Sequence, residues 1–124
     1  MEYIRVLLVD DNVIIRKSFT HLLNEIANVN IVGECSDGVE VLPFIKHHQV
    51  DVIFMDINMK FMDGYEATKN VKQYAPKIKV IGFSSSDATH DVGEMMDSGA
   101  DGFLSKFNAE KISIIAELNR VTSL

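Results

Sequence analysis

Short runs of apolar residues alternate along the chain with segments in which apolar residues recur every three or four positions. The runs are brief and rich in Val, Ile or Phe, which is typical of strands buried on both faces of a sheet. Strands are predicted over residues 3–9, 30–35, 52–55, 79–84 and 102–104. Strands that alternate with helical segments predict βαβ units, here five βα units around one parallel sheet. The pattern leaves open the order of the strands within the sheet.

The segments between the strands have the period of amphipathic helices, each with one apolar face. The residues predicted to face the core are Ile15, Phe19, Leu22, Leu23 and Ile26 in the first helix, Val41, Leu42 and Ile45 in the second, Ala67, Thr68 and Val71 in the third, Val92, Met95 and Met96 in the fourth, and Ile112, Ile115 and Leu118 in the fifth. Asp63 stands where an N-cap of the third helix is expected, and Gly99 stands where a glycine commonly ends the fourth.

Polar residues follow the strands at the point where each strand ends. They are Asp10 and Asp11 after "VLLV", Asp56 at the end of "VIFMD", Ser84 and Ser85 at the end of the fourth strand, and Lys106 after the fifth. Because all parallel strands deliver their carboxyl ends to one edge of the sheet, we expect these side chains to meet there.

Three crowded carboxylates require a positive partner. Two unit charges about 4 Å apart cost about 4 kcal/mol at an effective dielectric constant near 20. Oxygen ligands without nearby His or Cys favour Mg²⁺, with Mn²⁺ as the second choice, over zinc. Mg²⁺ bound by carboxylates usually acts on phosphates, so the sequence predicts a metal-assisted phosphate chemistry at this edge.

Composition narrows the classes of function. The chain has 124 residues, a formal charge of −6 and a pI near 5.1, which predict one domain over residues 1–124 and disfavour direct binding to nucleic acid. No segment has the length of a membrane span and the N-terminus lacks a signal-peptide pattern, so we expect a soluble, cytoplasmic protein. Cys35 is the only cysteine and is expected to be a buried, inert thiol.

The motifs "VLLVDDN", "VIFMDINMKFMDGYEA", "VIGFSSSD" and "SGADGFLSK" occur in the order and spacing of a known family. Over essentially its whole length the chain resembles the receiver domain of two-component response regulators, and the LuxR-type transcriptional branch is the most similar. The resemblance implies a flavodoxin-like, doubly wound sheet of five parallel strands flanked by helices. It implies a phosphoacceptor switch that assists its own phosphorylation and dephosphorylation, and not an independent enzyme.

The same resemblance implies roles for individual residues. Asp56 would accept a phosphoryl group from a phosphohistidine of a sensor histidine kinase or a phosphotransfer protein. The implied Mg²⁺ ligands are Asp10, Asp11, Asp56 and the backbone carbonyl of Asn58. Ser84 would bond to one phosphoryl oxygen and Lys106 would neutralise another, while Phe103 would change conformer as Ser84 moves. A DNA-binding output domain would lie outside this chain, and the resemblance leaves open a homodimer that forms on phosphorylation.

Two positions depart from the family pattern. Lys60 stands where a proline usually follows the methionine after the acceptor strand, and Phe107 stands where a proline joined by a cis peptide usually follows the lysine. A cis bond before a residue other than proline costs about 2.5–4 kcal/mol. A trans Lys106–Phe107 bond would aim Lys106 differently, and a loop over residues 58–62 that lacks the proline would be less stiff.

Two other classes of protein compete with this interpretation. A small phosphatase of the haloacid dehalogenase type also uses an aspartyl nucleophile, but it needs a second Asp two residues later, where this chain has Asn58. A flavodoxin-like nucleotide-binding domain would need a phosphate-binding loop after the first strand, and "DDNVII" contains neither glycine nor a run of hydroxyls.

Overall fold

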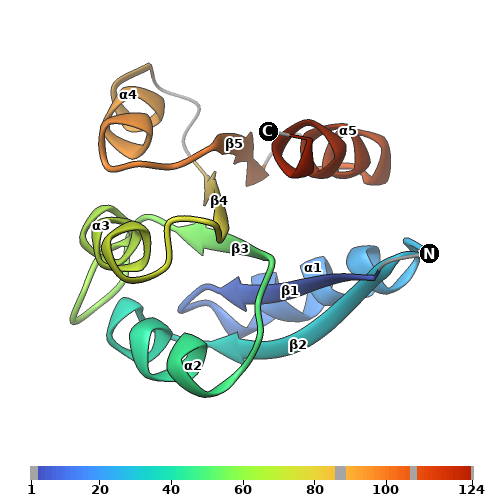
Figure 1. Ribbon diagram of the computed structural model, residues 1–124. Coiled ribbons are helices and arrows are strands. Elements are labelled where there is room, and N and C mark those ends of the chain that lie inside the picture. Colours follow the sequence, from blue (N-terminus) through green and yellow to red (C-terminus); the bar gives the residue numbers. More distant parts are fainter. Residues whose placement is uncertain (1–2, 86–88, 107–108, 124) are drawn as a thin grey trace.

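The computed structural model describes residues 3–85, 89–106 and 109–123. In the described part of the chain, five strands alternate with five helices, and the short 3₁₀ turn η1 precedes the second helix (Figure 1). Along the chain these are β1 (Ile4–Val9), α1 (Val13–Asn24), β2 (Val29–Cys35), η1 (Gly38–Glu40), α2 (Val41–His47), β3 (Val52–Asp56), α3 (Gly64–Tyr74), β4 (Lys79–Ser84), α4 (Thr89–Asp97), β5 (Gly102–Ser105) and α5 (Lys111–Thr122). The strands differ from the predicted ranges by at most one residue at either end.

The five strands form one sheet in the order β2-β1-β3-β4-β5, and every neighbouring pair is parallel. The chain runs outward from β1 to β2, then crosses back over β1 to β3 and continues to β5. The direction of winding therefore reverses between β1 and β3, and the carboxyl edge at such a reversal is where ligands bind in doubly wound folds. This order is that of the flavodoxin-like class, and the predicted fold is confirmed.

Helices cover both faces of the sheet (Figure 1). Helices α2, α3 and α4 pack on one face, where Leu7 and Val9 of β1 join their apolar residues. Helices α1 and α5 pack on the other, where Val6 and Leu8 join theirs. Since alternate residues of a strand point to opposite faces, a strand covered on both sides must be apolar throughout. This explains why β1 and β3 read as continuous hydrophobic runs.

Most of the predicted core positions are buried, but two are wrong. Met95 is fully buried while its neighbour Met96 is 44% exposed, and Ile112 is 76% exposed. Adjacent residues of a helix point about 100° apart, and in α4 it is Met95 that points into the core while Met96 lies on the side toward solvent. In α5 the buried residues are Ile114, Leu118 and Val121, which leaves Ile112 on the outer side.

Both predicted helix boundaries are confirmed. Oδ1 of Asp63 accepts the N–H of Glu66 at 2.9 Å and caps α3. Gly99, after α4, has a φ of 109°, a conformation that glycine adopts readily. Cys35 is buried, which raises the pKa of its thiol to about 12. Within the described part of the chain, no helix is long and apolar enough to cross a lipid bilayer.

Candidate functional site

Three carboxylates converge at the carboxyl edge of β1 and β3. Asp10 and Asp11 follow β1 directly, and Asp56 is the last residue of β3, its neighbour in the sheet. One carboxylate oxygen of each lies within 4.8 Å of the others. Asp10 is fully buried and Asp56 is only 4% exposed, whereas Asp11 faces solvent. We call these three residues the acidic cluster.

Lys106 lies against the acidic cluster. Its ammonium nitrogen is 2.6 Å from Oδ2 of Asp10 and donates a hydrogen bond of 3.1 Å to Oδ1 of Asp56. It also lies 5.3 Å from the centre of the Phe83 ring. Burial would lower the pKa of Lys106, but the two carboxylates outweigh burial and raise the pKa above its usual value. The Lys106 ammonium therefore points toward Asp10 and Asp56. The Lys106–Phe107 peptide bond, for which the sequence left the choice between cis and trans open, lies outside the described residues.

Asp56 is harder to ionise than an ordinary aspartate. Burial is the main cause and the negative charge of Asp10 adds to it, so the pKa of Asp56 rises to about 6 despite the opposing effects of Lys106 and the Ile57 N–H. That N–H donates to Oδ1 of Asp56 at 2.9 Å. Oδ1 of Asp56 therefore has two donors among the described residues. The carboxylate is mainly ionised at neutral pH.

The acidic cluster fits a divalent cation. Three carboxylates against one ammonium leave an excess of negative charge, and Mg²⁺ prefers such oxygen donors. Oδ1 of Asp10 accepts the N–H of Asn12 at 2.8 Å, but buried Oδ2 has no aligned hydrogen-bond donor and only the ion-pair contact with Lys106. The case for a divalent cation therefore rests on the excess negative charge and the oxygen donors of the acidic cluster.

The other predicted residues lie around the same edge. Ser84 ends β4 and is buried. Because Phe83 lies opposite Asp56 in the register, Ser84 is one residue beyond the end of β3. Asn58 lies two residues after Asp56 and is exposed. Phe103 lies opposite Gly82 in β5, is partly buried against the core under α2–α4, and its N–H donates to Glu117 at 2.9 Å.

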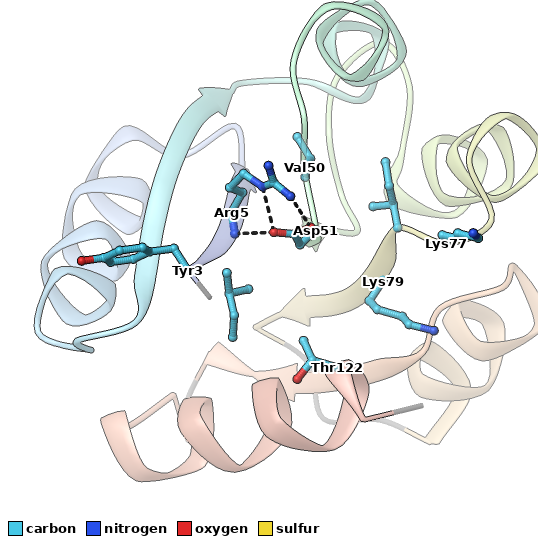
Figure 2. A pocket seen from close by; sticks show the side chains of 9 residues that line it. Tyr3, Arg5, Val50, Asp51, Lys77, Lys79 and Thr122 are labelled. Atoms are coloured by element: carbon cyan, nitrogen blue, oxygen red, sulfur yellow. Dashed lines mark hydrogen bonds and ion pairs between the residues drawn. The ribbon is translucent and has the colours of Figure 1, made fainter. Parts of the chain in front are cut away.

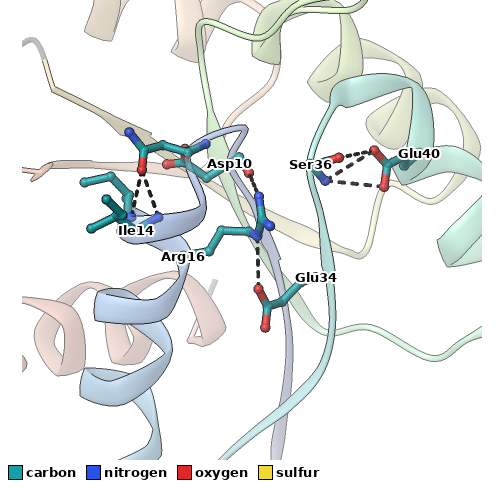
Figure 3. A network of polar contacts seen from close by, with 8 residues as sticks. Asp10, Ile14, Arg16, Glu34, Ser36 and Glu40 are labelled. Carbon is teal, nitrogen blue, oxygen red and sulfur yellow. Dashed lines mark hydrogen bonds and ion pairs between the residues drawn. The ribbon is translucent and has the colours of Figure 1, made fainter.

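Arg16 supports the acidic cluster and was not predicted from the sequence. Its Nη1 donates to the carbonyl oxygen of Asp10 at 2.6 Å and its Nε to Oε1 of Glu34 at 3.0 Å (Figure 3). Arg16 thus links the turn after β1 to β2. A cation in the first turns of a helix opposes the helix dipole, which is the one signal in the sequence that could have singled it out.

A pocket of about 430 Å³ lies away from this chemistry, at the opposite edge of the sheet. Figure 2 shows it beside the start of β1 and β4, with the Arg5 side chain held by Asp51. Asp51 already pairs with that guanidinium, and none of the residues that line the pocket belongs to the acidic cluster.

Comparison with known proteins defines the family. The model of the response regulator receiver domain matches residues 6–117, and the chain belongs to this family. It is 35% identical over 119 residues to the response regulator protein VraR of Staphylococcus saprophyticus, covering 96% of this chain and 56% of VraR. It is 29% identical to a nitrate/nitrite response regulator homolog of Haemophilus influenzae, covering 95% of this chain and 56% of the homolog. The chain thus spans about half the length of these curated relatives.

Solved structures of response regulator domains have the same fold as this chain. The signal receiver domain of the putative response regulator NarL from Mycobacterium tuberculosis superposes with a TM-score of 0.90 at 32% identity and full coverage of both chains. The response regulator domain of Thermotoga maritima CheB gives a TM-score of 0.88 at 25% identity, covering 99% of this chain and 98% of that one.

Receiver domains are the switches of two-component signalling, and phosphorylation on an aspartate followed by a conformational change is the standard function of the family. The predicted family is confirmed over the phosphatase and nucleotide-binding alternatives.

Proposed function

We propose that Asp56 is the phosphoacceptor of this receiver domain. The observation that carries the proposal is the placement of its buried carboxylate in the acidic cluster, with Oδ1 held by Lys106 and Ile57. Oδ2 attacks the phosphorus of a phosphohistidine; the new O–P bond forms as the P–N bond breaks, and the imidazole leaves with the electron pair and takes up a proton. An ionised carboxylate is a competent nucleophile for this transfer.

Asp10, Asp11, Asp56 and the backbone carbonyl of Asn58 would hold Mg²⁺, and Mn²⁺ suits the same oxygen donors. When bound, the ion supplies positive charge to the phosphoryl oxygens, which is the main need of a phosphoryl transfer. Lys106 neutralises a further oxygen from the side of β5, and the Ser84 hydroxyl donates to another. These groups make the domain assist its own phosphorylation, and water activated at the same site would return it to the resting state.

The partners follow from this chemistry. A sensor histidine kinase or a phosphotransfer protein provides the phosphohistidine, and the protein works in the cytoplasm. Phosphorylation then moves Ser84 and Phe103 and changes the surface of α4, β5 and α5, which controls an output domain or a partner. We propose a DNA-binding output domain outside residues 1–124 and dimerisation on phosphorylation, while the acidic receiver itself, with its formal charge of −6, does not bind nucleic acid.

Acetyl phosphate tests the proposal without knowledge of the kinase. Incubation with Mg²⁺ and acetyl phosphate should add the mass of one phosphoryl group, and peptide mapping should place it on Asp56. The Asp56→Asn variant should gain none, while Asp51→Asn, at the opposite edge of the sheet, should react as the wild type does. Equal phosphorylation of Asp56→Asn would contradict the proposal, as would modification that is independent of the metal.

A further inference from the structure

Asp37 is a buried carboxylate outside the acidic cluster. It stands between β2 and η1, is only 5% exposed, and uses both oxygens to bind backbone N–H groups. Oδ2 accepts the N–H of Phe61 at 2.9 Å, and Oδ1 accepts those of Met62 and Val39, each at 3.0 Å. Burial would raise the pKa of Asp37, but these N–H groups hold it below its usual value. The carboxylate is therefore ionised and fully engaged near neutral pH.

Two of these bonds reach a distant part of the chain. Phe61 and Met62 are 24 and 25 residues away from Asp37, in the loop between β3 and α3. The bond to Val39 is sufficient to cap η1, so capping does not explain why Asp37 reaches across to this loop. The following residue, Gly38, lies so close to the loop that a Cβ atom on it would be 2.5 Å from the carbonyl oxygen of Met62. The two backbones are in direct contact.

The loop that Asp37 binds connects the acceptor to α3. It begins after Asp56, contains Asn58 and ends at Asp63, the N-cap of α3. Near its base the N–H of Gly64 donates to the carbonyl of Ile57 at 2.7 Å. Lys60, in its middle, does not fix φ as a proline would. Hydrogen bonds from outside the loop must therefore restrain it, and Asp37 provides two.

We propose that Asp37 is a positioning residue for the metal site, which holds the β3–α3 loop so that the backbone at Asn58 faces the acidic cluster. This inference rests on the proposed function, since it assigns Asp37 a part in the binding of the metal at that site. Asp37 is not a member of the acidic cluster. It acts as groups outside the ligand shell do, whose removal typically weakens metal binding about 10- to 100-fold.

The test compares Asp37 with a matched carboxylate. Asp51 also accepts a backbone N–H, that of Arg5 at 2.8 Å, but at the opposite edge of the sheet. Mg²⁺ affinity is measured by calorimetry, unfolding by urea, and amide hydrogen exchange by NMR in metal-free protein. Asp37→Ala should weaken Mg²⁺ about tenfold and expose the amides of Phe61 and Met62 to exchange. Asp51→Ala should lose stability yet bind Mg²⁺ as the wild type does.

Asp37→Asn is a second variant for the case that Asp37→Ala does not fold. It keeps the shape and one acceptor oxygen, so we expect a smaller loss of Mg²⁺ affinity than for alanine. Wild-type affinity in both Asp37 variants would overturn the inference, as would an equal loss in Asp51→Ala. Failure of the wild type to bind Mg²⁺ would instead contradict the proposed function; the amide exchange of Phe61 and Met62 in metal-free protein would then still decide whether Asp37 holds the loop.

Discussion

The ammonium nitrogen of Lys106 lies 2.6 Å from Oδ2 of the fully buried Asp10. The two residues belong to opposite ends of the chain and meet because β1 and the segment after β5 deliver their ends to the same edge of the sheet. Lys106 thereby supplies positive charge between Asp10 and Asp56, the two buried members of the acidic cluster. In metal-free protein, the Lys106 ammonium offsets the repulsion between the Asp10 and Asp56 carboxylates.

Removing this ammonium should destabilise the metal-free protein. Breaking a buried ion pair by deleting one partner leaves an uncompensated buried charge and costs about 3–5 kcal/mol. Lys106→Met should therefore lower the free energy of unfolding by about 3 kcal/mol in urea titrations with a chelator, and Mg²⁺ should restore part of it because the ion binds the folded state. Lys111→Met, which breaks an exposed pair with Glu25, should change stability by less than about 1 kcal/mol. Equal effects of the two substitutions would contradict the charge balance described above.

Asp56→Asn should stabilise the metal-free protein at neutral pH. The pKa of Asp56 is about 6 in the folded protein against 3.8 as the ordinary value, so folding disfavours the ionised form. The contribution of Asp56 to stability is thus complete below pH 3.8 and is lost as the pH rises through 6. Asparagine does not ionise and avoids this loss, which amounts to at most about 3 kcal/mol.

Urea unfolding in the presence of a chelator checks the sign. Asp56→Asn should be more stable than the wild type at pH 7.5 and about equal at pH 4. Asp51→Asn provides the opposite case, because its bonds to Arg5 hold the pKa of Asp51 below its usual value despite burial. Asp51→Asn should therefore be less stable than the wild type at pH 7.5. A loss of stability in Asp56→Asn at that pH would show that Lys106 stabilises the ionised form of Asp56 more than burial and Asp10 disfavour it.

The sequence predicts the fold and the acidic cluster for one shared reason. Parallel strands end at one edge, so Asp10 and Asp56 could be placed together without knowing that β1 and β3 are neighbours. It does not predict Asp37 or Arg16 as supporting residues, because each binds backbone groups, which are the same in every residue. Met96 was misplaced because it has the spacing of the apolar face of α4 together with Val92 and Met95. Ile112 was misplaced because α5 has apolar residues on more than one side, so that periodicity alone does not select the buried face.

Gly82 should control the conformation of Phe103. A Cβ atom on Gly82 would lie 2.8 Å from Cδ1 of Phe103 and 3.0 Å from Cε of Met95, so alanine must push these side chains aside. Gly82→Ala should displace the Phe103 ring and cost about 1–3 kcal/mol through overpacking. Gly93→Ala is the control: a Cβ atom there meets nothing within 4 Å, and the change should stabilise α4 by about 1 kcal/mol. Ring chemical shifts of Phe103 that are unaltered in Gly82→Ala would contradict the prediction.

Ser84→Ala should accept a phosphoryl group yet fail to complete the switch. A ligand drives a conformational change only through contacts that it makes better in one state. Hydrogen bonds from Ser84 and Lys106 to the phosphoryl group would supply about 1.5–3 kcal/mol each, against about 5.5 kcal/mol needed to invert a 1:99 equilibrium. Losing the Ser84 hydroxyl therefore leaves the conformational change incomplete. In protein fully phosphorylated by acetyl phosphate, the NMR chemical-shift changes around Phe103 and residues 92–97 should be much smaller in Ser84→Ala than in the wild type.

The control is Ser98→Ala, which removes a buried hydroxyl bonded to the Glu94 carbonyl at 2.7 Å and should retain the wild-type chemical-shift changes. The full wild-type shift pattern in phosphorylated Ser84→Ala would show that the hydroxyl does not couple the acceptor to the surface.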